Sequence, residues 1–434
     1  MPLLCEQTSA YATLPVRFRS TRKDLQTVQQ TFKWGTLLAL TAGLMGACSP
    51  LPALQPGALT AGVFTAPPDA SELSERQPVY RIQVKAGTDI DALSKAGMDI
   101  FSVRKGTVEG RMTDAAQAVA KERGLSLTAM RDPFDSRSRG LPAGFMTYQA
   151  IVSRLQAIAT ANPEVATLVD LGPSWQTVQG SANRRILAIR ITHGPAAKPK
   201  ALFTAGHHAR ELAPPEIAMR LIEELVGGYG KNDALTKLVD TRETWVVPVM
   251  NPDGRVDVEG GNDMWRKNRH TFAKSVGVDL NRNYDSHFSG GDTNPNNETY
   301  HGQSAFSEPE LLGLRDLYAK EKFAVSMDYH AYAGAVIWPP GWDRGNTPDQ
   351  AAFPKIGQVL TAKNGYDGDT IARRFYLAPG SICDWAYEKF GVMAFGAEMG
   401  TSFRPAATEL PKLYAENRDG ALHLIQIADN PKGR

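Results

Sequence analysis

The chain of 434 residues is poor in cysteine and has almost no excess of charge of either sign. Its three cysteines, Cys5, Cys48 and Cys383, are too few for a disulfide framework and too scattered for a cysteine-rich metal site. A net charge of +2 favours neither nucleic acid nor an acidic partner. There is no internal repeat and no long low-complexity tract. The remaining composition, 42% hydrophobic and 22% charged, is typical of a soluble globular protein with at least one large core.

Residues 1–47 have the pattern of a leader and export signal. Lys33 precedes an apolar stretch, Gly35 to Ala47, that is too short to span a bilayer as a mature helix and ends in small residues. The small residues directly before Cys48 resemble a bacterial lipobox, which implies cleavage before Cys48 and acylation of its sulfur. Plain secretion is the alternative. We therefore expect an exported protein, in the cell envelope or secreted, whose only membrane contact is a lipid anchor at Cys48.

The rest of the chain is expected to divide into four segments. Residues 48–77 have the composition of a flexible linker. Residues 78–130 predict a small α+β module, because "VYRIQVKA" alternates like a strand and "DAAQAVAKERG" has helical spacing. Residues 131–144 are polar and rich in Pro and Gly, which indicates a second linker that is open to proteolysis. Residues 145–430 then form one large domain.

Helical patterns alternate with short β-rich runs throughout this large domain. The predicted strands are "RILAIRI", "KALFTAG", "TWVVPVM", "FAVSMDY", "AVIWP" and "VMAFGAE". The clearest helix is "PPEIAMRLIEELVGGYG", with Pro215 in its first turn and apolar residues on one face. Helices between buried strands predict an α/β fold, with a mixed, mostly parallel twisted sheet covered by helices on both faces.

Polar side chains follow four of the predicted strands. His208 and Glu211 follow the second run, and the turn Asn251–Gly254 follows the third. His330 follows the fourth run, and Glu398 ends the sixth. Ligand sites in open α/β sheets form outside the carboxyl ends of strands. If these strands are neighbours, two histidines and two glutamates meet at one edge of the sheet.

Taken singly, these groups have ordinary explanations. His208 and Glu211 could lie in a solvated loop, and His330 could be a hydrogen-bonded core histidine. Glu398 is different, because a carboxylate at the end of an apolar strand is costly to bury unless it is paired or used. Together, two histidines and one carboxylate with an open fourth position form the ligand set of hydrolytic zinc sites. A nearby glutamate can then take a proton from water, and arginines can stabilise an oxyanion.

Several further motifs occur in the order known from one enzyme family. They are "HARE", "NPDG", "WRKNR", "DLNRN", "HAY", "YLAPGSICDW" and "FGAEM". From about Phe145 to Ile427 the chain resembles the zinc carboxypeptidases of the carboxypeptidase A and bacterial carboxypeptidase T type. The resemblance implies one Zn²⁺ per catalytic domain, bound by His208, Glu211 and His330, with His207 as a bystander. It also implies that Glu398 is the general base.

The resemblance extends to residues that would bind substrate. It implies that Arg266 stabilises the oxyanion, that Asn281 and Arg282 bind the terminal carboxylate of a peptide, and that Tyr376 closes over bound substrate. Three further residues would line substrate subsites: Arg210, Tyr332 and Cys383. Cys383 at the base of the side-chain pocket favours hydrophobic or aromatic C-terminal residues, whereas Asp328 near the same pocket could favour Lys or Arg.

The function implied by this resemblance is zinc-dependent hydrolysis of the C-terminal peptide bond by a monomeric exopeptidase. One alternative is a peptidase of the same fold that cuts γ-D-glutamyl-diaminopimelate bonds in peptidoglycan stem peptides. Another is an envelope lipoprotein that binds peptide ends without catalysis. Family analogy suggests that the module of residues 78–130 is a propeptide, cut near Arg137 or Arg139, or else a retained accessory domain.

Overall fold

The computed structural model describes residues 77–85, 90–132 and 140–433, all of which belong to one compact unit, Thr65–Arg434. The expected export signal, Cys48 and the expected cleavage positions Arg137 and Arg139 lie outside the described residues. Within the described ranges, no helix is both long enough and apolar enough to cross a membrane.

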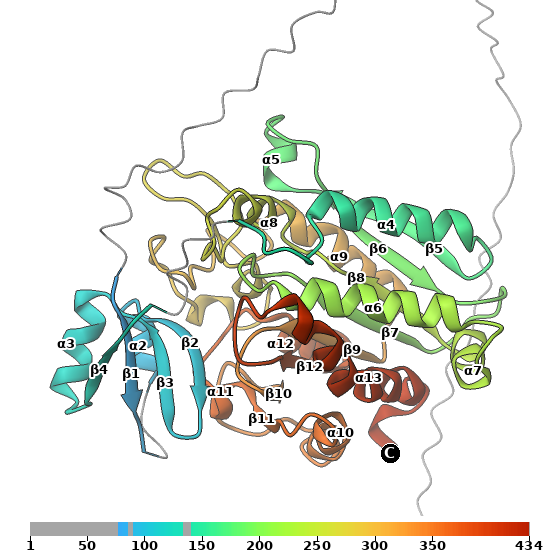
Figure 1. Cartoon of the computed structure of the whole chain (residues 1–434). Coiled ribbons are helices and arrows are strands. Elements are labelled where there is room, and N and C mark those ends of the chain that lie inside the picture. Colours follow the sequence, from blue (N-terminus) through green and yellow to red (C-terminus); the bar gives the residue numbers. More distant parts are fainter. Residues whose placement is uncertain (1–76, 86–89, 133–139, 434) are drawn as a thin grey trace, which may run out of the picture. The chain divides into compact units, whose positions relative to one another are not determined.

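The large domain is built on one eight-stranded sheet (Figure 1). Its strands, in sheet order, are β11 (Asp367–Thr370), β10 (Ala335–Trp338), β12 (Met393–Glu398), β9 (Val325–His330), β7 (Lys200–Ala205), β8 (Glu243–Val247), β6 (Arg185–Ile191) and β5 (Ala166–Pro173). The pairs β10–β11, β12–β9, β9–β7 and β7–β8 are parallel, and the other three pairs are antiparallel. The sheet is therefore mixed and mostly parallel, as predicted.

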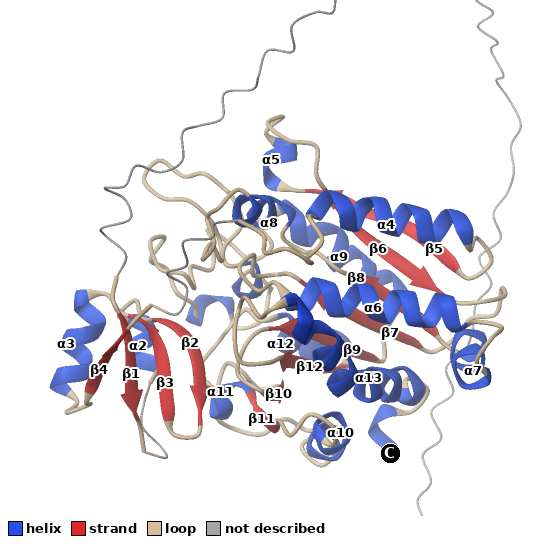
Figure 2. Cartoon of the chain, in the orientation of Figure 1, coloured by secondary structure: helices blue, strands red, loops and turns tan. Residues whose placement is uncertain are grey.

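Helices cover both faces of this sheet (Figure 2). On β7, Phe203 packs into a core with Leu221 of α6 (Ala213–Gly228), whereas its neighbour Leu202 packs into a second core with Leu314 of α9 (Pro309–Glu321). Successive strand residues point to opposite faces, so these two cores lie on the two sides of the sheet. The helices are α4 (Tyr148–Ala161), α5 (Trp175–Val178), α6 (Ala213–Gly228), α7 (Asp233–Thr241), α8 (Pro252–Glu259), α9 (Pro309–Glu321), α10 (Ala352–Thr361), α11 (Ile371–Arg374), α12 (Ile382–Phe390) and α13 (Leu410–Ile427), with short 3₁₀ turns η1 (Leu280–Arg282), η2 (Phe288–Gly290), η3 (Ala407–Glu409) and η4 (Pro431–Gly433).

The N-terminal module has its own antiparallel sheet. Its elements are β1 (Val79–Gln83), α2 (Asp91–Lys95), β2 (Asp99–Arg104), β3 (Thr107–Arg111), α3 (Asp114–Glu122) and β4 (Leu127–Met130), with sheet order β2-β3-β1-β4. Ile82, Leu93, Val108 and Met112 form a separate small core. The small α+β module predicted from the sequence is therefore confirmed.

The sheet order brings the site-bearing strands together. β12, β9, β7 and β8 are consecutive neighbours and run in the same direction, so their carboxyl ends share one edge. Gly206, directly after β7, has φ of +69°, a left-handed conformation that L-residues rarely adopt. This turn redirects the chain from the strand into the segment that carries His208 and Glu211.

Candidate active site

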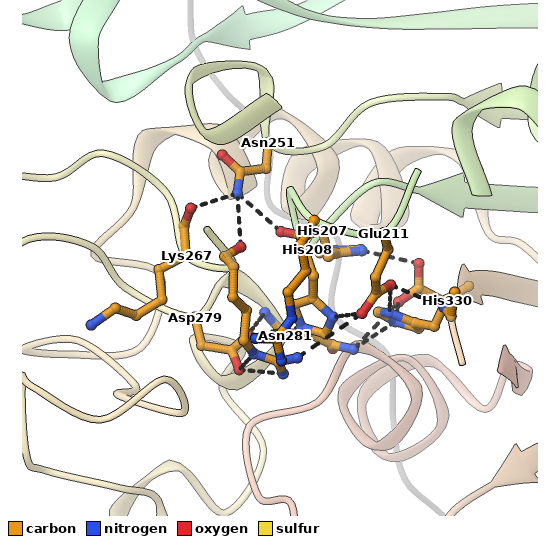
Figure 3. Close-up of polar contacts among 12 residues, drawn as sticks. His207, His208, Glu211, Asn251, Lys267, Asp279, Asn281 and His330 are labelled. Atoms are coloured by element: carbon orange, nitrogen blue, oxygen red, sulfur yellow. Dashed lines mark hydrogen bonds and ion pairs between the residues drawn. The ribbon is translucent and has the colours of Figure 1, made fainter. Parts of the chain in front are cut away.

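Two histidines and a glutamate meet at the shared strand edge (Figure 3). His208 Nδ1 lies 2.6 Å from Glu211 Oε1, and His330 Nδ1 lies 3.0 Å from Glu211 Oε2. All three side chains are buried. Burial alone would raise the pKa of Glu211, but the two imidazoles bring it below its usual value. One atom from each residue, all within 4.8 Å of one another, could hold a metal ion, and two imidazole nitrogens with one carboxylate suit zinc.

A further carboxylate lies behind His208. Asp279 Oδ1 is 3.1 Å from His208 Nε2, on the side of the ring away from Glu211. A carboxylate at this nitrogen favours the tautomer with the proton on Nε2, which leaves the Nδ1 lone pair for a metal. Asp279 also accepts hydrogen bonds from Arg266 Nε at 3.1 Å and Nη2 at 2.7 Å.

Arg266 and Glu398 line the same cavity as the three candidate ligands. Glu398 ends β12, beside His330 at the end of β9. Burial raises the pKa of Glu398 to about 7; His330 opposes this rise and Glu211 reinforces it. A carboxyl group with a pKa near neutrality is suited to general acid–base chemistry.

The loops around the site are tied together by Asn251, at the start of α8 (Figure 3). Its Nδ2 donates to the carbonyl oxygens of His207 at 3.1 Å and Lys267 at 3.0 Å, while its Oδ1 accepts from the Gly254 amide at 2.9 Å. The "NPDG" turn therefore holds the chain beside His208 against the chain beside Arg266.

Polar groups suited to a carboxylate occupy another part of the cavity. Arg282, on the 3₁₀ turn η1, donates from Nη1 to the carbonyl of Asn281 at 2.7 Å and from Nη2 to the hydroxyl of Tyr376 at 3.3 Å. Asn281 Oδ1 accepts from the Ile382 amide at 2.9 Å. Asn281, Arg282 and Tyr376 all line the cavity.

The rest of the cavity wall is formed mostly by apolar residues. It includes Ile337, Ile371, Ala378, Cys383 and Gly396. The Cys383 thiol is free and buried, and burial raises its pKa well above the usual value, so it is a neutral group here. Tyr332 also lines the cavity, with its ring edge-on to Phe403 at a centroid distance of 4.8 Å.

Arg210 has a different environment from the other predicted substrate residues. It is not part of the cavity wall; its guanidinium makes two bonds to Asp99 of the module, at 2.6 and 2.7 Å, and lies over Phe403. Burial would raise the pKa of Asp99, but Arg210 lowers it below the usual value. This pair is therefore ionic and links β2 of the module to the segment of the candidate ligands.

Sequence reasoning missed several residues of the site. Asp279 lies in the "DLNRN" motif, two positions before Asn281, and that motif was the available signal. The module residues Ile100, Phe101 and Ser102 also line the cavity, and nothing in their sequence indicated it. Asp328, expected near the side-chain pocket, is not in the cavity wall and bonds instead to His207 and His330.

Comparison with known proteins agrees with this geometry. The sequence profile described as zinc carboxypeptidase, peptidase M14, matches residues 151–420, more than half of the chain. The chain therefore belongs to the zinc carboxypeptidase family, whose members are hydrolases that act on peptide bonds. It is a metallocarboxypeptidase, as the sequence motifs predicted.

Similar proteins come from animals and bacteria. Human carboxypeptidase A1 is 28% identical over 331 residues, covering 72% of this chain and 77% of the relative. Zinc carboxypeptidase A 1 of Drosophila melanogaster is 34% identical over 271 residues, 58% of this chain and 60% of the relative. A zinc carboxypeptidase of Saccharothrix mutabilis subsp. capreolus is 26% identical over 391 residues, 83% and 88% of the two chains.

Solved structures show the same fold. The carboxypeptidase A of Helicoverpa armigera has a TM-score of 0.69 at 22% identity and covers 82% of this chain and 97% of its own. Thrombin-activatable fibrinolysis inhibitor has a TM-score of 0.66 at 19% identity and covers 82% and 99%.

Proposed function

We propose that this metallocarboxypeptidase releases single residues, preferentially hydrophobic or aromatic ones, from the C-terminal ends of peptides. The observation that carries the proposal is one cavity that contains His208, Glu211, His330, Glu398 and Arg282. It therefore combines a metal-ligand set, an acid–base group and an anion-binding group.

We assign His208, Glu211 and His330 as the ligands of a single zinc ion. Their inward-facing donor atoms support this assignment, because both Nδ1 atoms are directed to Glu211. Zinc bound there would supply a Lewis acid that acidifies water and polarises a carbonyl group.

The chain's own groups handle protons and charge during hydrolysis. Glu398 takes a proton from the attacking water, whose oxygen bonds to the carbonyl carbon of the last peptide bond. As the carbon–nitrogen bond breaks, Glu398 returns that proton to the leaving amine. Arg266 supplies fixed positive charge for the oxyanion, and Asp279 holds its guanidinium in place with two hydrogen bonds.

Selection for the chain end comes from Arg282 and Asn281. A guanidinium binds a planar carboxylate with two parallel hydrogen bonds, which an amide cannot match. The current partner of Arg282 Nη2 is the Tyr376 hydroxyl, a contact that is readily exchanged for a substrate carboxylate. The apolar wall around Cys383 then receives the side chain of the last residue.

Matched peptides that end in Phe, Lys or Phe amide test this function. With the zinc-loaded protein, we expect release of Phe faster than Lys, no release from the amide, and loss of both activities with a chelator. Absence of release from every peptide while zinc stays bound would contradict a general carboxypeptidase. Release from peptidoglycan stem peptides in that case would favour the γ-D-glutamyl-diaminopimelate peptidase, and no release there either would favour a binding protein.

We also propose that the module of residues 78–130 is an inhibitory propeptide. Three observations support this: Asp99 pairs with Arg210, the following residues 100–102 contribute to the cavity wall, and Asp91 Oδ1 accepts from the Leu377 amide, next to Tyr376, at 2.8 Å. A bound peptide would need the space and the tyrosine movement that these contacts restrict.

Asp99→Asn tests the module's role. We expect the uncut chain to become at least several-fold more active, because the amide loses the ionic part of the Arg210 contact. Asp114→Asn, on the exposed start of α3, is the matched control and should leave activity unchanged. The module would instead be an accessory domain if both variants are as active as the unchanged protein and if cleavage within residues 131–144 does not change the activity of any of the three.

We propose in addition that the chain is exported and carries a lipid on Cys48. Cys48→Ala should abolish incorporation of labelled fatty acid and release the protein from the membrane fraction. If the unchanged protein incorporates no label and is found in the medium, it is secreted without an anchor.

A further inference from the structure

Asp328 is a buried carboxylate to which the proposed mechanism gives no role. It lies on β9, two residues before His330, so the two side chains are on the same face of the strand. Only 2% of Asp328 is exposed, and the residue is absent from the cavity wall. It therefore cannot select substrate side chains directly.

Both oxygens of Asp328 are engaged. Oδ2 lies 2.6 Å from His330 Nε2 and 3.4 Å from Asn281 Nδ2. Oδ1 accepts from the Thr204 hydroxyl at 2.7 Å and lies 3.0 Å from His207 Nδ1. A carboxylate held by four groups from three separate segments has a fixed position.

The contact with His330 matches the contact on the other histidine. In each case Nδ1 faces Glu211 and Nε2 faces an aspartate, Asp279 for His208 and Asp328 for His330. Such carboxylates set the tautomer of a ligating histidine, fix the orientation of its ring and increase its basicity.

We propose that Asp328 is a positioning residue that orients His330 for zinc, and that Thr204 and His207 hold Asp328 in place. The inference rests on the proposed function, because it takes His330 as a zinc ligand. It assigns His207 to the support of the site: its other nitrogen, Nε2, lies 2.8 Å from the Tyr284 hydroxyl, which anchors the ring from behind.

His207, Asp328 and His330 are also close enough to hold a metal ion themselves, with one atom from each within 4.8 Å of the others. Two observations favour a supporting network. The Thr204 hydroxyl already occupies Asp328 Oδ1, and Tyr284 occupies His207 Nε2. Neither His207 nor Asp328 lines the cavity, whereas His330 does.

Zinc affinity of the full-length chain, measured by competition with a chromogenic chelator, tests this inference. Asp328→Asn keeps the shape and removes the charge; we expect zinc to bind about 10- to 100-fold more weakly, the range for loss of such outer partners. Asp384→Asn is the matched control, a buried aspartate that bonds to Gly341 and Ser381, away from the histidines. It should bind zinc as the unchanged protein does. Cobalt substitution gives a second readout, because a reoriented His330 changes the visible absorption of Co²⁺.

If Asp328→Asn does not fold, zinc affinity is measured on Thr204→Val instead. Loss of one hydrogen bond to Asp328 should weaken zinc binding by about twofold or more. If Asp328→Asn folds and its zinc affinity and cobalt spectrum are unchanged, the inference is overturned. If Asp328→Asn does not fold, the same result in Thr204→Val overturns it. Two zinc ions per chain, falling to one in Asp328→Asn, would overturn it in favour of a second metal site. An unchanged protein that binds no zinc would instead contradict the proposed function, and this inference with it.

Discussion

The two ends of the cavity are built in opposite ways. At the proposed zinc end, each histidine has a carboxylate on both sides of its ring, and Arg266 is fixed by Asp279. At the proposed side-chain end, the wall is largely apolar, with residues such as Ile337, Ile371 and Ala378 and one neutral thiol, Cys383. Proton transfer and oxyanion stabilisation need side chains that hydrogen bonds hold in place. A pocket for an apolar side chain needs a complementary shape and no unpaired charge in its wall.

The largest expected effect is at the zinc end. Glu398→Gln removes the proposed acid–base group while retaining its shape, so we expect kcat to fall by about 10²- to 10⁴-fold. Zinc content, measured by atomic absorption, should stay at one per chain. A variant that keeps more than a tenth of the original kcat would show that another group moves the proton.

The next largest effect is expected at Arg282, the proposed binding group for the substrate carboxylate. Arg282→Ala should lower kcat/KM on peptides with a free C-terminus by about 10²-fold, because truncating one partner of a buried charge pair costs about 2–5 kcal/mol. Slow hydrolysis of the amide peptide, if measurable, should not change. An equal loss on acid and amide peptides would assign Arg282 a structural role.

A smaller effect is expected at the side-chain end. Cys383→Asp places a carboxylate in the apolar wall, so the Lys-to-Phe ratio of kcat/KM should rise by about tenfold or more. Cys383→Ala, which adds no charge, should leave the ratio in favour of Phe. If neither substitution alters the ratio, the side chain of the last residue does not reach Cys383.

The smallest expected effect is on the pH profile of kcat/KM, which distinguishes two carboxyl groups with similar pKa values. Burial raises the pKa of Glu398 and of Asp384 to about 7 in both cases. Because the base must be ionised, kcat/KM should fall tenfold per pH unit below the pKa of Glu398; bound zinc favours the carboxylate, so the midpoint lies at or below about 7. Asp384→Asn should leave this acid limb in place, and its disappearance in that variant would assign the limb to Asp384.

Most strands of the large domain could be predicted from the sequence, but the contacts between distant segments could not. Six of the eight strands of its sheet match predicted runs: β6, β7, β10 and β12 lie within them, and β8 and β9 each extend one residue beyond them. β11 was missed because "DGDT" is polar and mostly exposed at the sheet edge, where no apolar pattern is required. β5 is half-exposed and breaks its alternation near Gly172, where the register with β6 shifts.

The structure brings predicted site residues together where a motif carries its own geometry. Residues three apart, such as His208 and Glu211, stay close in any compact turn, and strand ends indicate which edge they occupy. Contacts such as Arg210 with Asp99 depend on docking of separate segments and leave no local pattern. The same holds for the Asp279–His208 contact, although both residues lie in motifs that were recognised.

Glu211 and His330 are in contact although they lie 119 positions apart in the sequence. A contact of such long range carries the entropic cost of closing a long loop, and proteins that depend on such contacts fold more slowly. During synthesis, the site gains His208 long before His330, and Glu398 arrives last. If these residues form the catalytic site, as proposed, we expect hydrolytic activity only once the sheet is complete; a metal that binds only the folded edge would then add to the stability of the folded state by mass action.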